Sequence, residues 1–366
     1  MIKTRTISSI ARRLLPWFAR HARDLPWRRL RDPYGIWVSE VMLQQTQVKT
    51  VVPYWTRWMK ALPTVQALAR ARPQRIHKLW EGLGYYTRVR NLQKAAWAIM
   101  EQHGGEFPQS YEQVLALPGI GRYTAGAICS IAFDQPTPIL DGNVIRVLTR
   151  LFGVTGDPRE KRTNALLWEL AERLVAEGAR GRGVRAPGDC SQLNQALMEL
   201  GALVCVPRIP RCEACPVRQH CVARRLGCVE ELPARARRAR STQRRFHAFI
   251  LRHGAKYLVR QRPAGVVNAH LWEFPNREAS GDEDERRTFQ SLFGAKPIAL
   301  KKLCTIKHTI TRYRITLEVF TSEGRTMLPN GDSQWLSVEG MRRMAFASAH
   351  RKLVEKLAGD GYKIPE

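Results

Sequence analysis

The stretch Leu117-Pro-Gly-Ile-Gly-Arg-Tyr-Thr-Ala125 places two glycines between two segments that have the residue pattern of helices. Upstream, Ser110-Tyr-Glu-Gln113 has the form of a capping box, which predicts that a short helix begins there. Gly119 and Gly121 can adopt positive φ and leave N–H groups open where the next helix, expected over 124–133, begins. Because open N–H groups and the helix dipole attract anions, the stretch predicts a phosphate-binding hairpin. Taken alone, a glycine pair between helices is more often only a tight turn.

The charge of the chain favours the phosphate interpretation. Its 366 residues include 60 Lys and Arg against 32 Asp and Glu, a net charge of +28, as expected of a nucleic-acid binder. Contacts to phosphate groups would hold the DNA backbone without reading base sequence. No apolar run approaches the ~18 residues of a membrane span. The N-terminal segment, with Arg12, Arg13 and Arg20 among apolar residues, has the composition of a transit peptide, but it continues without a break into candidate site residues.

Four of the eight cysteines have the spacing C-x6-C-x2-C-x5-C: Cys205, Cys212, Cys215 and Cys221. In a chain without a secretory leader this density indicates a metal site in a reducing compartment, and four sulfurs are what a [4Fe–4S] cluster requires. A zinc site is the alternative, although zinc modules usually pair two short elements across a longer gap. We expect a structural cluster that fixes the loop 206–211; a redox role stays open. The other cysteines are expected to be buried apolar residues: Cys129, Cys190, Cys228 and Cys304.

Two carboxylates are candidates for acid–base chemistry. Asp141, in Ile139-Leu-Asp-Gly-Asn-Val144, precedes a helical pattern that would stabilise its charge; a plain N-cap aspartate is the alternative. Glu40, in Trp37-Val-Ser-Glu-Val-Met-Leu-Gln-Gln-Thr46, lies among apolar residues, where burial would raise its pKa and keep it protonated. An ordinary surface glutamate is the alternative there. A protonated acid beside an ionised carboxylate is the pattern that cleaves glycosidic bonds.

The residue pattern changes along the chain. As far as Cys221 the apolar spacing is helical, and then a basic stretch, 224–245, reads as an exposed linker. Beyond it, apolar residues alternate over 313–319, as in a half-buried strand, and Ser348 is expected to cap a final helix. We therefore expect a helical domain followed by an α+β domain.

These motifs resemble a known family. The hairpin, Asp141 and the cysteine loop are marks of the helix-hairpin-helix DNA glycosylases of the endonuclease III type. Ser39-Glu-Val-Met-Leu-Gln-Gln-Thr-Gln-Val48 and Gly82-Leu-Gly-Tyr-Tyr86 are similar to the MutY family of adenine DNA glycosylases, and the match covers nearly the whole chain. The resemblance implies a base excision repair enzyme that flips adenine mispaired with 8-oxoguanine or guanine out of the duplex and hydrolyses its N-glycosidic bond.

The resemblance also implies a domain plan. An all-α catalytic domain would span 1–225, with the helix-hairpin-helix at about 110–133 and the [4Fe–4S] loop at 205–221. A basic linker over 226–245 would lead to an α+β Nudix-like recognition domain over 246–360. The implied partner is double-stranded DNA, bound by a monomer without membrane association in a bacterial-type cytoplasm, at the nucleoid.

Individual roles carry over to matching positions. Glu40 matches the acid that protonates adenine N7, and Asp141 the carboxylate that stabilises or traps the sugar cation. The family's supporting groups at the same site correspond here to Tyr123 and Asn143. The family residues that form the walls of the adenine pocket correspond to Arg23, Leu25, Trp27 and Gln195. The residues that enter the duplex beside 8-oxoguanine match Gln45, Thr46 and Tyr85, and an aromatic at 85 can replace part of the lost base stacking.

Position 123 separates two activities. Bifunctional relatives that also cut the DNA strand carry a lysine there, whose amine forms a Schiff base with the sugar. Tyr123 therefore implies a monofunctional glycosylase that leaves an abasic site. Two alternatives stay open: an endonuclease III-like glycosylase with lyase activity, and a non-catalytic iron–sulfur DNA-binding protein.

The C-terminal part resembles the family's recognition domain through Leu271-Trp-Glu-Phe-Pro275 and Lys307-His-Thr-Ile-Thr-Arg312. The acidic stretch 282–287 lacks the R-E-x-x-E-E order that holds magnesium in Nudix enzymes, so nucleotide hydrolysis is not expected. The family usually presents Phe-Ser-His to 8-oxoguanine, and the aligned residues here are Ile310, Thr311 and Arg312. We expect the Thr311 hydroxyl to contact the lesion and Arg312 to contact phosphate.

Overall fold

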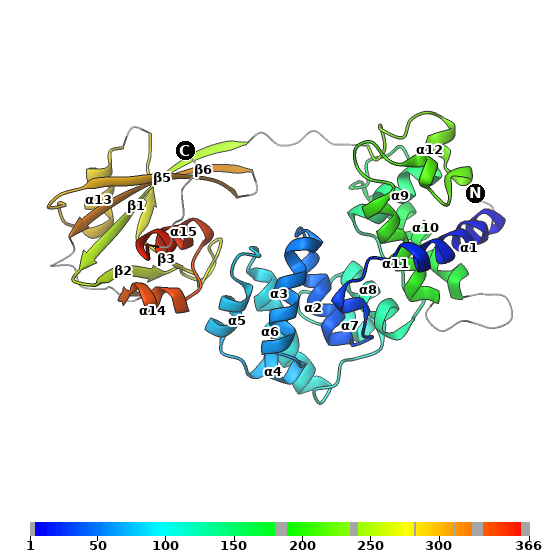
Figure 1. Cartoon of the computed structure of the whole chain (residues 1–366), viewed down its shortest axis with the longest axis horizontal. Coiled ribbons are helices and arrows are strands. Elements are labelled where there is room, and N and C mark those ends of the chain that lie inside the picture. Colours follow the sequence, from blue (N-terminus) through cyan, green and yellow to red (C-terminus); the bar gives the residue numbers. More distant parts are fainter. Residues whose placement is uncertain are drawn as a thin grey trace. The chain divides into compact units, whose positions relative to one another are not determined.

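A computed structural model of the chain describes residues 4–179, 189–234, 241–281, 283–310, 312–323 and 332–359. The chain divides into two compact units (Figure 1). The helical unit contains Met1–Arg70 and Arg90–Arg237, and the mixed unit contains Ala71–Val89 and Arg238–Glu366. The sequence placed 71–89 in the first domain, whereas in the structure this segment packs with the C-terminal residues.

Helices build the helical unit. Their bounds are α1 Thr4–His21, α2 Pro33–Leu43, α3 Val48–Ala61, α4 Val65–Arg70, α6 Thr87–Gln102, α7 Tyr111–Ala116, α8 Arg122–Phe133, α9 Gly142–Phe152, α10 Lys161–Ala179, α11 Asp189–Leu203 and α12 Val222–Arg225. Short 3-10 turns lie at η1 Pro26–Arg28, η2 Cys212–Ala214 and η3 Arg218–His220. Helix α6 begins in the mixed unit and continues into the helical unit. None of the helices in the described ranges is both long and apolar enough to cross a membrane.

The N-terminal segment is part of the folded core. Helix α1 is amphipathic, with buried side chains at three- and four-residue spacing that pack against α10 and α11. These side chains are Ile7, Ile10, Leu14, Trp17 and Phe18. The transit-peptide interpretation of this segment therefore has no support in the structure.

Helix α2 is buried on every side, which is why its sequence shows no polar face. All residues from Tyr34 to Met42 are buried, and the helix packs against α3 and α8. Asp32 caps its N-terminus by accepting hydrogen bonds from the N–H groups of Tyr34 at 3.1 Å and Gly35 at 2.9 Å. Glu40 is thereby carried into an apolar environment.

The predicted hairpin joins α7 to α8. Ser110 Oγ accepts the Gln113 N–H at 3.2 Å, so the expected cap is present. Gly119 has a φ of +78°, and a Cβ there would lie 2.5 Å from the Cβ of Asn91. Gly121 has a φ of −100° and is the N-cap of α8, so the expectation of positive φ at this second glycine was wrong. A helix N-cap requires extended backbone, which any residue adopts.

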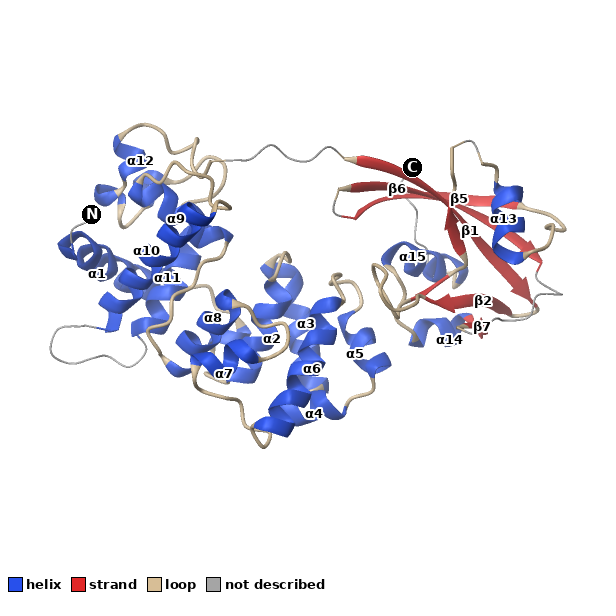
Figure 2. Cartoon of the chain, turned by 180° about the vertical axis from the view of Figure 1, so that it is seen from behind, coloured by secondary structure: helices blue, strands red, loops and turns tan. Residues whose placement is uncertain are grey.

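The mixed unit is built on one sheet (Figure 2). Its strands are β1 Thr242–His253, β2 Lys256–Gln261, β3 Trp272–Glu273, β4 Asn276–Glu278, β5 Lys301–Ile310, β6 Tyr313–Glu323 and β7 Ser333–Ser337. The strand order is β3-β2-β1-β6-β5, with β4 beside β1 and β7 beside β2. Strands β1 and β6 run parallel, and the remaining pairs are antiparallel. Its helices are α5 Pro73–Trp80, α13 Glu285–Phe293, α14 Val338–Arg343 and α15 Ser348–Leu357.

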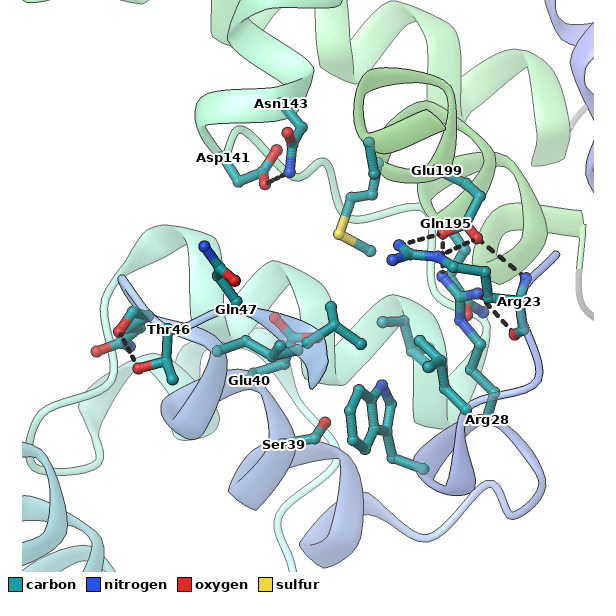
Figure 3. Close-up of a pocket in the computed structure, with 18 of the residues that line it drawn as sticks. Arg23, Arg28, Ser39, Glu40, Thr46, Gln47, Asp141, Asn143, Gln195 and Glu199 are labelled. Carbon is teal, nitrogen blue, oxygen red and sulfur yellow. Dashed lines mark hydrogen bonds and ion pairs between the residues drawn. The ribbon is translucent and has the colours of Figure 1, made fainter. Parts of the chain in front are cut away.

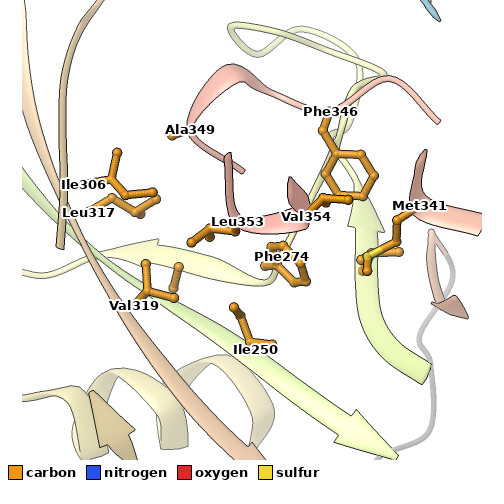
Figure 4. Packing of buried hydrophobic residues seen from close by; sticks show 12 residues of the cluster. Ile250, Phe274, Ile306, Leu317, Val319, Met341, Phe346, Ala349, Leu353 and Val354 are labelled. Carbon is orange, nitrogen blue, oxygen red and sulfur yellow. The ribbon is translucent and has the colours of Figure 1, made fainter. Parts of the chain in front are cut away.

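Both faces of the sheet are covered. Successive residues of β1 point to opposite faces, so Ile250 joins the core beneath α14 and α15 (Figure 4), whereas Phe249 packs against Phe289 of α13. This double burial explains the uninterrupted apolar run from Ala248 to Leu251. The predicted strand over 313–319 lies within β6, with Leu317 and Val319 buried.

Three expectations differ from the structure in detail. The expected linker 226–245 is ordered at both ends: Leu232 is buried, and β1 begins at Thr242, while 235–240 lie outside the described residues. Helix α15 has Ala347 as its N-cap, without a side-chain hydrogen bond, so Ser348 is its first residue and not its cap. Cys129 and Cys190 are fully buried, but Cys228 and Cys304 are only half-buried.

Candidate functional site

A cavity of about 900 Å³ opens in the helical unit (Figure 3). Residues from η1, α2, the segment 44–49, α8, α9 and α11 form its walls. The cavity brings together ten residues singled out from the sequence, which are Arg23, Leu25, Trp27, Glu40, Gln45, Thr46, Tyr123, Asp141, Asn143 and Gln195. Four other described candidates for DNA contacts do not line it, namely Tyr85, Gly119, Gly121 and Arg312.

Glu40 is a buried acid in this cavity. Its residue is 4% exposed, and its Oε2 accepts a hydrogen bond of 2.6 Å from the hydroxyl of Tyr123. Burial raises the pKa of Glu40 to about 7; the Tyr123 hydrogen bond offsets part of this, and the charge of nearby Asp141 adds to it. A substantial fraction of Glu40 therefore carries a proton at neutral pH.

Asp141 is both the N-cap of α9 and a wall of the cavity. Its Oδ1 accepts the Val144 N–H at 2.7 Å, and its Oδ2 accepts the side-chain amide of Asn143 at 2.9 Å. Burial raises the pKa of Asp141, and these hydrogen bonds oppose the rise. The capping role and a catalytic role are thus compatible at one residue.

Asn143 joins Asp141 to the cysteine loop. Its Oδ1 accepts Nη2 of Arg146 at 2.8 Å, while Nε of Arg146 donates to the carbonyl of Cys205 at 2.7 Å. The carbonyl of Gly201, on α11, also accepts a hydrogen bond from Nη2 of Arg146 at 2.7 Å. A substitution at Arg146 would therefore disturb the support of both Asp141 and Cys205.

Sequence reasoning missed an ion-pair cluster in the wall of the cavity. Glu199 is fully buried and accepts hydrogen bonds from Arg23, at 2.7 and 2.9 Å, and from Arg28, at 2.9 Å; dashed lines in Figure 3 mark them. Burial alone would raise the pKa of Glu199, but the two arginines hold it at about 2. The available signal was the helical spacing of Gln195, Met198 and Glu199 on α11, which puts all three on one face.

The four predicted cysteine ligands line one small pocket, together with Arg150, Arg218 and Arg224. None of them is in a disulfide. Arg150 is 1% exposed and donates to Sγ of Cys205 at 3.4 Å and to the carbonyl of Val206 at 2.8 Å. Four free thiols that line one pocket beside the buried Arg150 and the exposed Arg218 and Arg224 fit an anionic thiolate cluster. Among the described residues, no group of three or more Cys, His, Asp or Glu is arranged around a point that a single metal ion would occupy.

The residues expected to enter the duplex lie in strained turns. Gln45 and Tyr85 have φ values of 57° and 48°, in the left-handed region that costs a residue with a side chain about 1–3 kcal/mol. Tyr85 is 48% exposed and belongs to the mixed unit. Arg312 is exposed and its guanidinium lies 5.2 Å from the ring centre of Tyr313, whereas Thr311 lies outside the described residues.

Comparison with known proteins determines the family. The chain is 37% identical over 411 residues to the adenine DNA glycosylase of Rattus norvegicus, covering 95% of this chain and 77% of the rat protein. It is also 37% identical to the Homo sapiens adenine DNA glycosylase, covering 94% of this chain and 73% of the human protein. The chain belongs to the adenine DNA glycosylase family. It is a base excision repair enzyme, a DNA glycosylase that acts on adenine.

Domain matches agree with the fold. Residues 38–173 match the HhH-GPD superfamily of base excision DNA repair proteins, and residues 247–356 match the NUDIX domain. The solved structure of a thermostable thymine-DNA glycosylase superposes with a TM-score of 0.53 at 28% identity, covering 61% of this chain and 98% of that one. The predicted fold class, a helix-hairpin-helix glycosylase followed by an α+β Nudix-like part, is confirmed.

Proposed function

We propose that this adenine DNA glycosylase is monofunctional and hydrolyses the N-glycosidic bond of adenine mispaired with 8-oxoguanine or guanine. The observation that carries the proposal is the hydrogen-bonded pair of Glu40 and Tyr123 in the same cavity as Asp141. A carboxylic acid with a pKa of about 7 can donate a proton at neutral pH, which an ordinary glutamate does poorly.

The chemistry follows from these two carboxyl groups. Glu40 donates its proton to N7 of the flipped adenine, so the electrons of the breaking glycosidic bond leave with a neutral base. The sugar develops oxocarbenium character, and the carboxylate of Asp141 stabilises that positive charge. Water then adds to the sugar carbon and loses a proton, which leaves an abasic site and restores Glu40. Because Asp141 accepts hydrogen bonds from Val144 and Asn143, its carboxylate is held in one orientation for this task.

The absence of an amine at position 123 supports monofunctional action. Burial, followed by the negative charge of Glu40, raises the pKa of Tyr123 well above its ordinary value, so the phenol stays neutral. A neutral phenol donates a hydrogen bond to Glu40 but does not form a Schiff base with the sugar.

The adenine pocket is assigned to the remaining walls of the cavity. Leu25 and Trp27 are buried and offer apolar faces for stacking, while Arg23 and Gln195 offer polar groups to the base edge. Glu199 contributes no uncompensated charge, because Arg23 and Arg28 pair with it. We add Arg28 and Glu199 to the pocket for this reason.

DNA contacts are assigned to the Gly119 hairpin and to the residues expected to enter the duplex. The hairpin, where Gly119 has a φ of +78°, would bind the phosphate backbone through N–H groups at the start of α8. Gln45, Thr46 and Tyr85 would fill the space that the flipped base leaves, and Tyr85 would restore stacking worth about 1–3 kcal/mol. The enzyme would act as a monomer on chromosomal DNA, at the nucleoid of a bacterial-type cytoplasm.

Lesion recognition is assigned to Thr311 and Arg312. The Thr311 hydroxyl would accept a hydrogen bond from N7–H of 8-oxoguanine, a group that guanine lacks. Thr311→Val removes only this contact, so it should lower the preference for 8-oxoguanine over guanine about three- to tenfold. Arg312→Ala should instead weaken both substrates alike and flatten their salt dependence, because phosphate contacts carry no base information. The reverse pattern would transfer lesion recognition to Arg312.

The four cysteines are proposed to hold a [4Fe–4S] cluster. Bound there, the cluster would supply four iron–thiolate bonds that fix the loop carrying the exposed Arg208 and Arg211, which could then meet phosphates. Protein purified anaerobically should be brown and contain about four irons per chain. Colourless protein with one zinc per chain would support the zinc alternative.

One gel assay separates the candidate functions. Duplexes with adenine opposite 8-oxoguanine, or opposite guanine, are incubated with enzyme and then treated with or without alkali. Cleavage that appears only after alkali supports the monofunctional glycosylase. Strand cutting without alkali would indicate a lyase, and no cleavage in either lane would indicate a DNA-binding protein without catalytic activity.

A further inference from the structure

Residues 71–89 form a small element of the mixed unit whose exposed tip is Tyr85. Helix α5 ends at Trp80, a turn with positive φ at Gly82, Gly84 and Tyr85 follows, and α6 begins at Thr87. Indole Nε1 of Trp80 donates to the carbonyl of Gly84 at 3.0 Å. The turn is thus bonded to the helix that precedes it.

A second set of contacts closes the turn from the other side. The guanidinium of Arg88 donates to the carbonyls of Leu83 at 3.1 Å and Gly84 at 3.3 Å. Its Cζ lies 5.6 Å from the ring centre of Tyr85, within cation–π range. Leu83 is buried, whereas Tyr85 is 48% exposed. The backbone is therefore held in one conformation that presents the tyrosine ring to solvent.

Glu81, the first residue of this turn, is bonded to the C-terminal part of the mixed unit. It is 7% exposed, and its Oε1 accepts the buried N–H of Phe346 at 2.9 Å. Its Oε2 lies 2.6 Å from Nζ of Lys78 and 3.6 Å from Nη1 of Arg351. Lys78 also donates to the carbonyl of Met344 at 3.0 Å.

The Phe346 amide needs this acceptor. Ala345, Phe346 and Ala347 lie between α14 and α15. The carbonyl of Ala345 accepts the Trp272 N–H at 2.8 Å, and the Ala347 N–H donates to the carbonyl of Trp272 at 3.0 Å. The Phe346 N–H between them is bonded instead to Glu81, and Phe346 itself is 2% exposed in the core. Without the carboxylate, a buried donor would lose its acceptor, which is strongly unfavourable.

We propose that Glu81 is a positioning residue that holds the Tyr85 turn against the C-terminal recognition part. Tyr85, which would enter the duplex, and the β5–β6 loop, which would contact 8-oxoguanine, then move together. The inference rests on the proposed roles of Tyr85 and of the β5–β6 loop. The consequence is that Glu81, which does not line the cavity of Glu40 and Asp141, determines how well the enzyme distinguishes 8-oxoguanine from guanine opposite adenine.

Two readouts on the whole 366-residue chain test the proposal. The first is hydrogen exchange of the Phe346 amide, which reports the Glu81 contact without any substrate. The second is the ratio of single-turnover rates for adenine release opposite 8-oxoguanine and opposite guanine. In Glu81→Ala, we expect Phe346 exchange to accelerate roughly tenfold or more, because a hydrogen bond to a charged acceptor is lost. The ratio of the two rates should fall about three- to tenfold, the size of effect expected when one hydrogen bond is lost.

Two further variants keep the test decisive. Glu81→Gln retains an oxygen acceptor for Phe346 but not the charge that faces Lys78 and Arg351, so it should recover part of both losses. Glu339→Gln removes an exposed carboxylate of the same unit, paired with Arg343 on the surface, and should change neither readout. If Glu81→Ala does not fold, the Glu81→Gln variant carries the comparison.

Each outcome has a defined meaning. Unchanged Phe346 exchange in Glu81→Ala would overturn the contact itself. Faster exchange with an unchanged rate ratio, or an equal loss on both substrates, would overturn its role in discrimination. If the wild type releases adenine opposite neither base, the proposed function fails, and the exchange experiment still decides whether Glu81 fastens the turn.

Discussion

The hydroxyl of Tyr123, on α8, lies 2.6 Å from Oε2 of Glu40, on α2, although the two residues are 83 positions apart in the sequence. The contact does two things at once. It orients the carboxyl group in the cavity, and it opposes part of the rise in pKa that burial imposes on Glu40. The pKa that results, about 7, lies where a general acid works best at neutral pH.

The rate of the chemical step should therefore depend on pH. Because only protonated Glu40 can donate, the single-turnover rate should fall as pH rises through about 7 and approach a tenfold loss per unit at higher pH. Glu40→Gln should abolish adenine release and leave DNA binding within about tenfold, since the lost proton is needed only as the bond breaks. Rapid-quench assays between pH 5.5 and 9, in ~0.5-unit steps, measure this. A flat profile would exclude Glu40 as the acid.

The same residue should limit stability at high pH. The folded-state pKa of Glu40 is raised from its ordinary 4.5 to about 7, so its protonated form stabilises the fold below the ordinary value and that contribution is lost as pH rises through about 7. Glu40→Gln is neutral throughout and should raise the free energy of unfolding at pH ~8, on the order of 2 kcal/mol, with little effect near pH ~4.5. Urea denaturation at both pH values tests the sign. Equal effects at the two values would contradict it.

Asp141 can be separated from its structural role. Asparagine caps helices about as well as aspartate, so Asp141→Asn should change the free energy of unfolding by less than about 1 kcal/mol. Adenine release should nevertheless be lost, because the neutral amide cannot stabilise the sugar cation. Asp284, the N-cap of α13, accepts the Arg287 N–H at 2.7 Å outside the cavity, and Asp284→Asn is the matched control. Near-normal release by Asp141→Asn would show that Asp141 is only a cap.

Alanine substitutions at the two hairpin glycines should have different effects on stability and DNA binding. A methyl group at Gly119 would meet the Cβ of Asn91 at 2.5 Å and impose a φ of +78° on alanine, whereas Gly121 has open space and a φ of −100°. Gly119→Ala should therefore destabilise the protein by about 1–3 kcal/mol and weaken binding to undamaged duplex. Gly121→Ala should change stability by less than about 1 kcal/mol. Thermal unfolding and fluorescence anisotropy with both variants provide the comparison; equal effects would refute the assigned geometry.

The features that could be predicted from the sequence are those that short segments determine. The cap at Ser110, the N-terminal position of Asp141 before α9 and the burial of Glu40 each depend on a few neighbouring residues. Ion pairs between distant segments were not predictable in this way: Glu199 meets Arg23 and Arg28 across 176 and 171 residues. No local pattern distinguishes such a glutamate from a surface one. The contact of Glu81 with Phe346, 265 residues away, escaped prediction for the same reason.

The last prediction concerns where the helical unit ends. Nε of the buried Arg150 donates to the carbonyl of Leu232 at 2.9 Å, although the sequence suggested an exposed linker there. A chain cut after residue 234 keeps this bond, and a chain cut after residue 225 loses it.

Both truncated chains lack the C-terminal residues that pack with 71–89. A difference in stability between the two chains therefore measures the contribution of residues 226–234 alone. The shorter chain should be less stable by about 1–3 kcal/mol, because a charged donor loses its acceptor and Leu232 its burial. Both should discriminate poorly between 8-oxoguanine and guanine opposite adenine, since neither has the recognition part. Equal unfolding midpoints would show that Leu232 adds nothing to the fold, and an intact preference in either chain would show that the helical unit reads the lesion by itself.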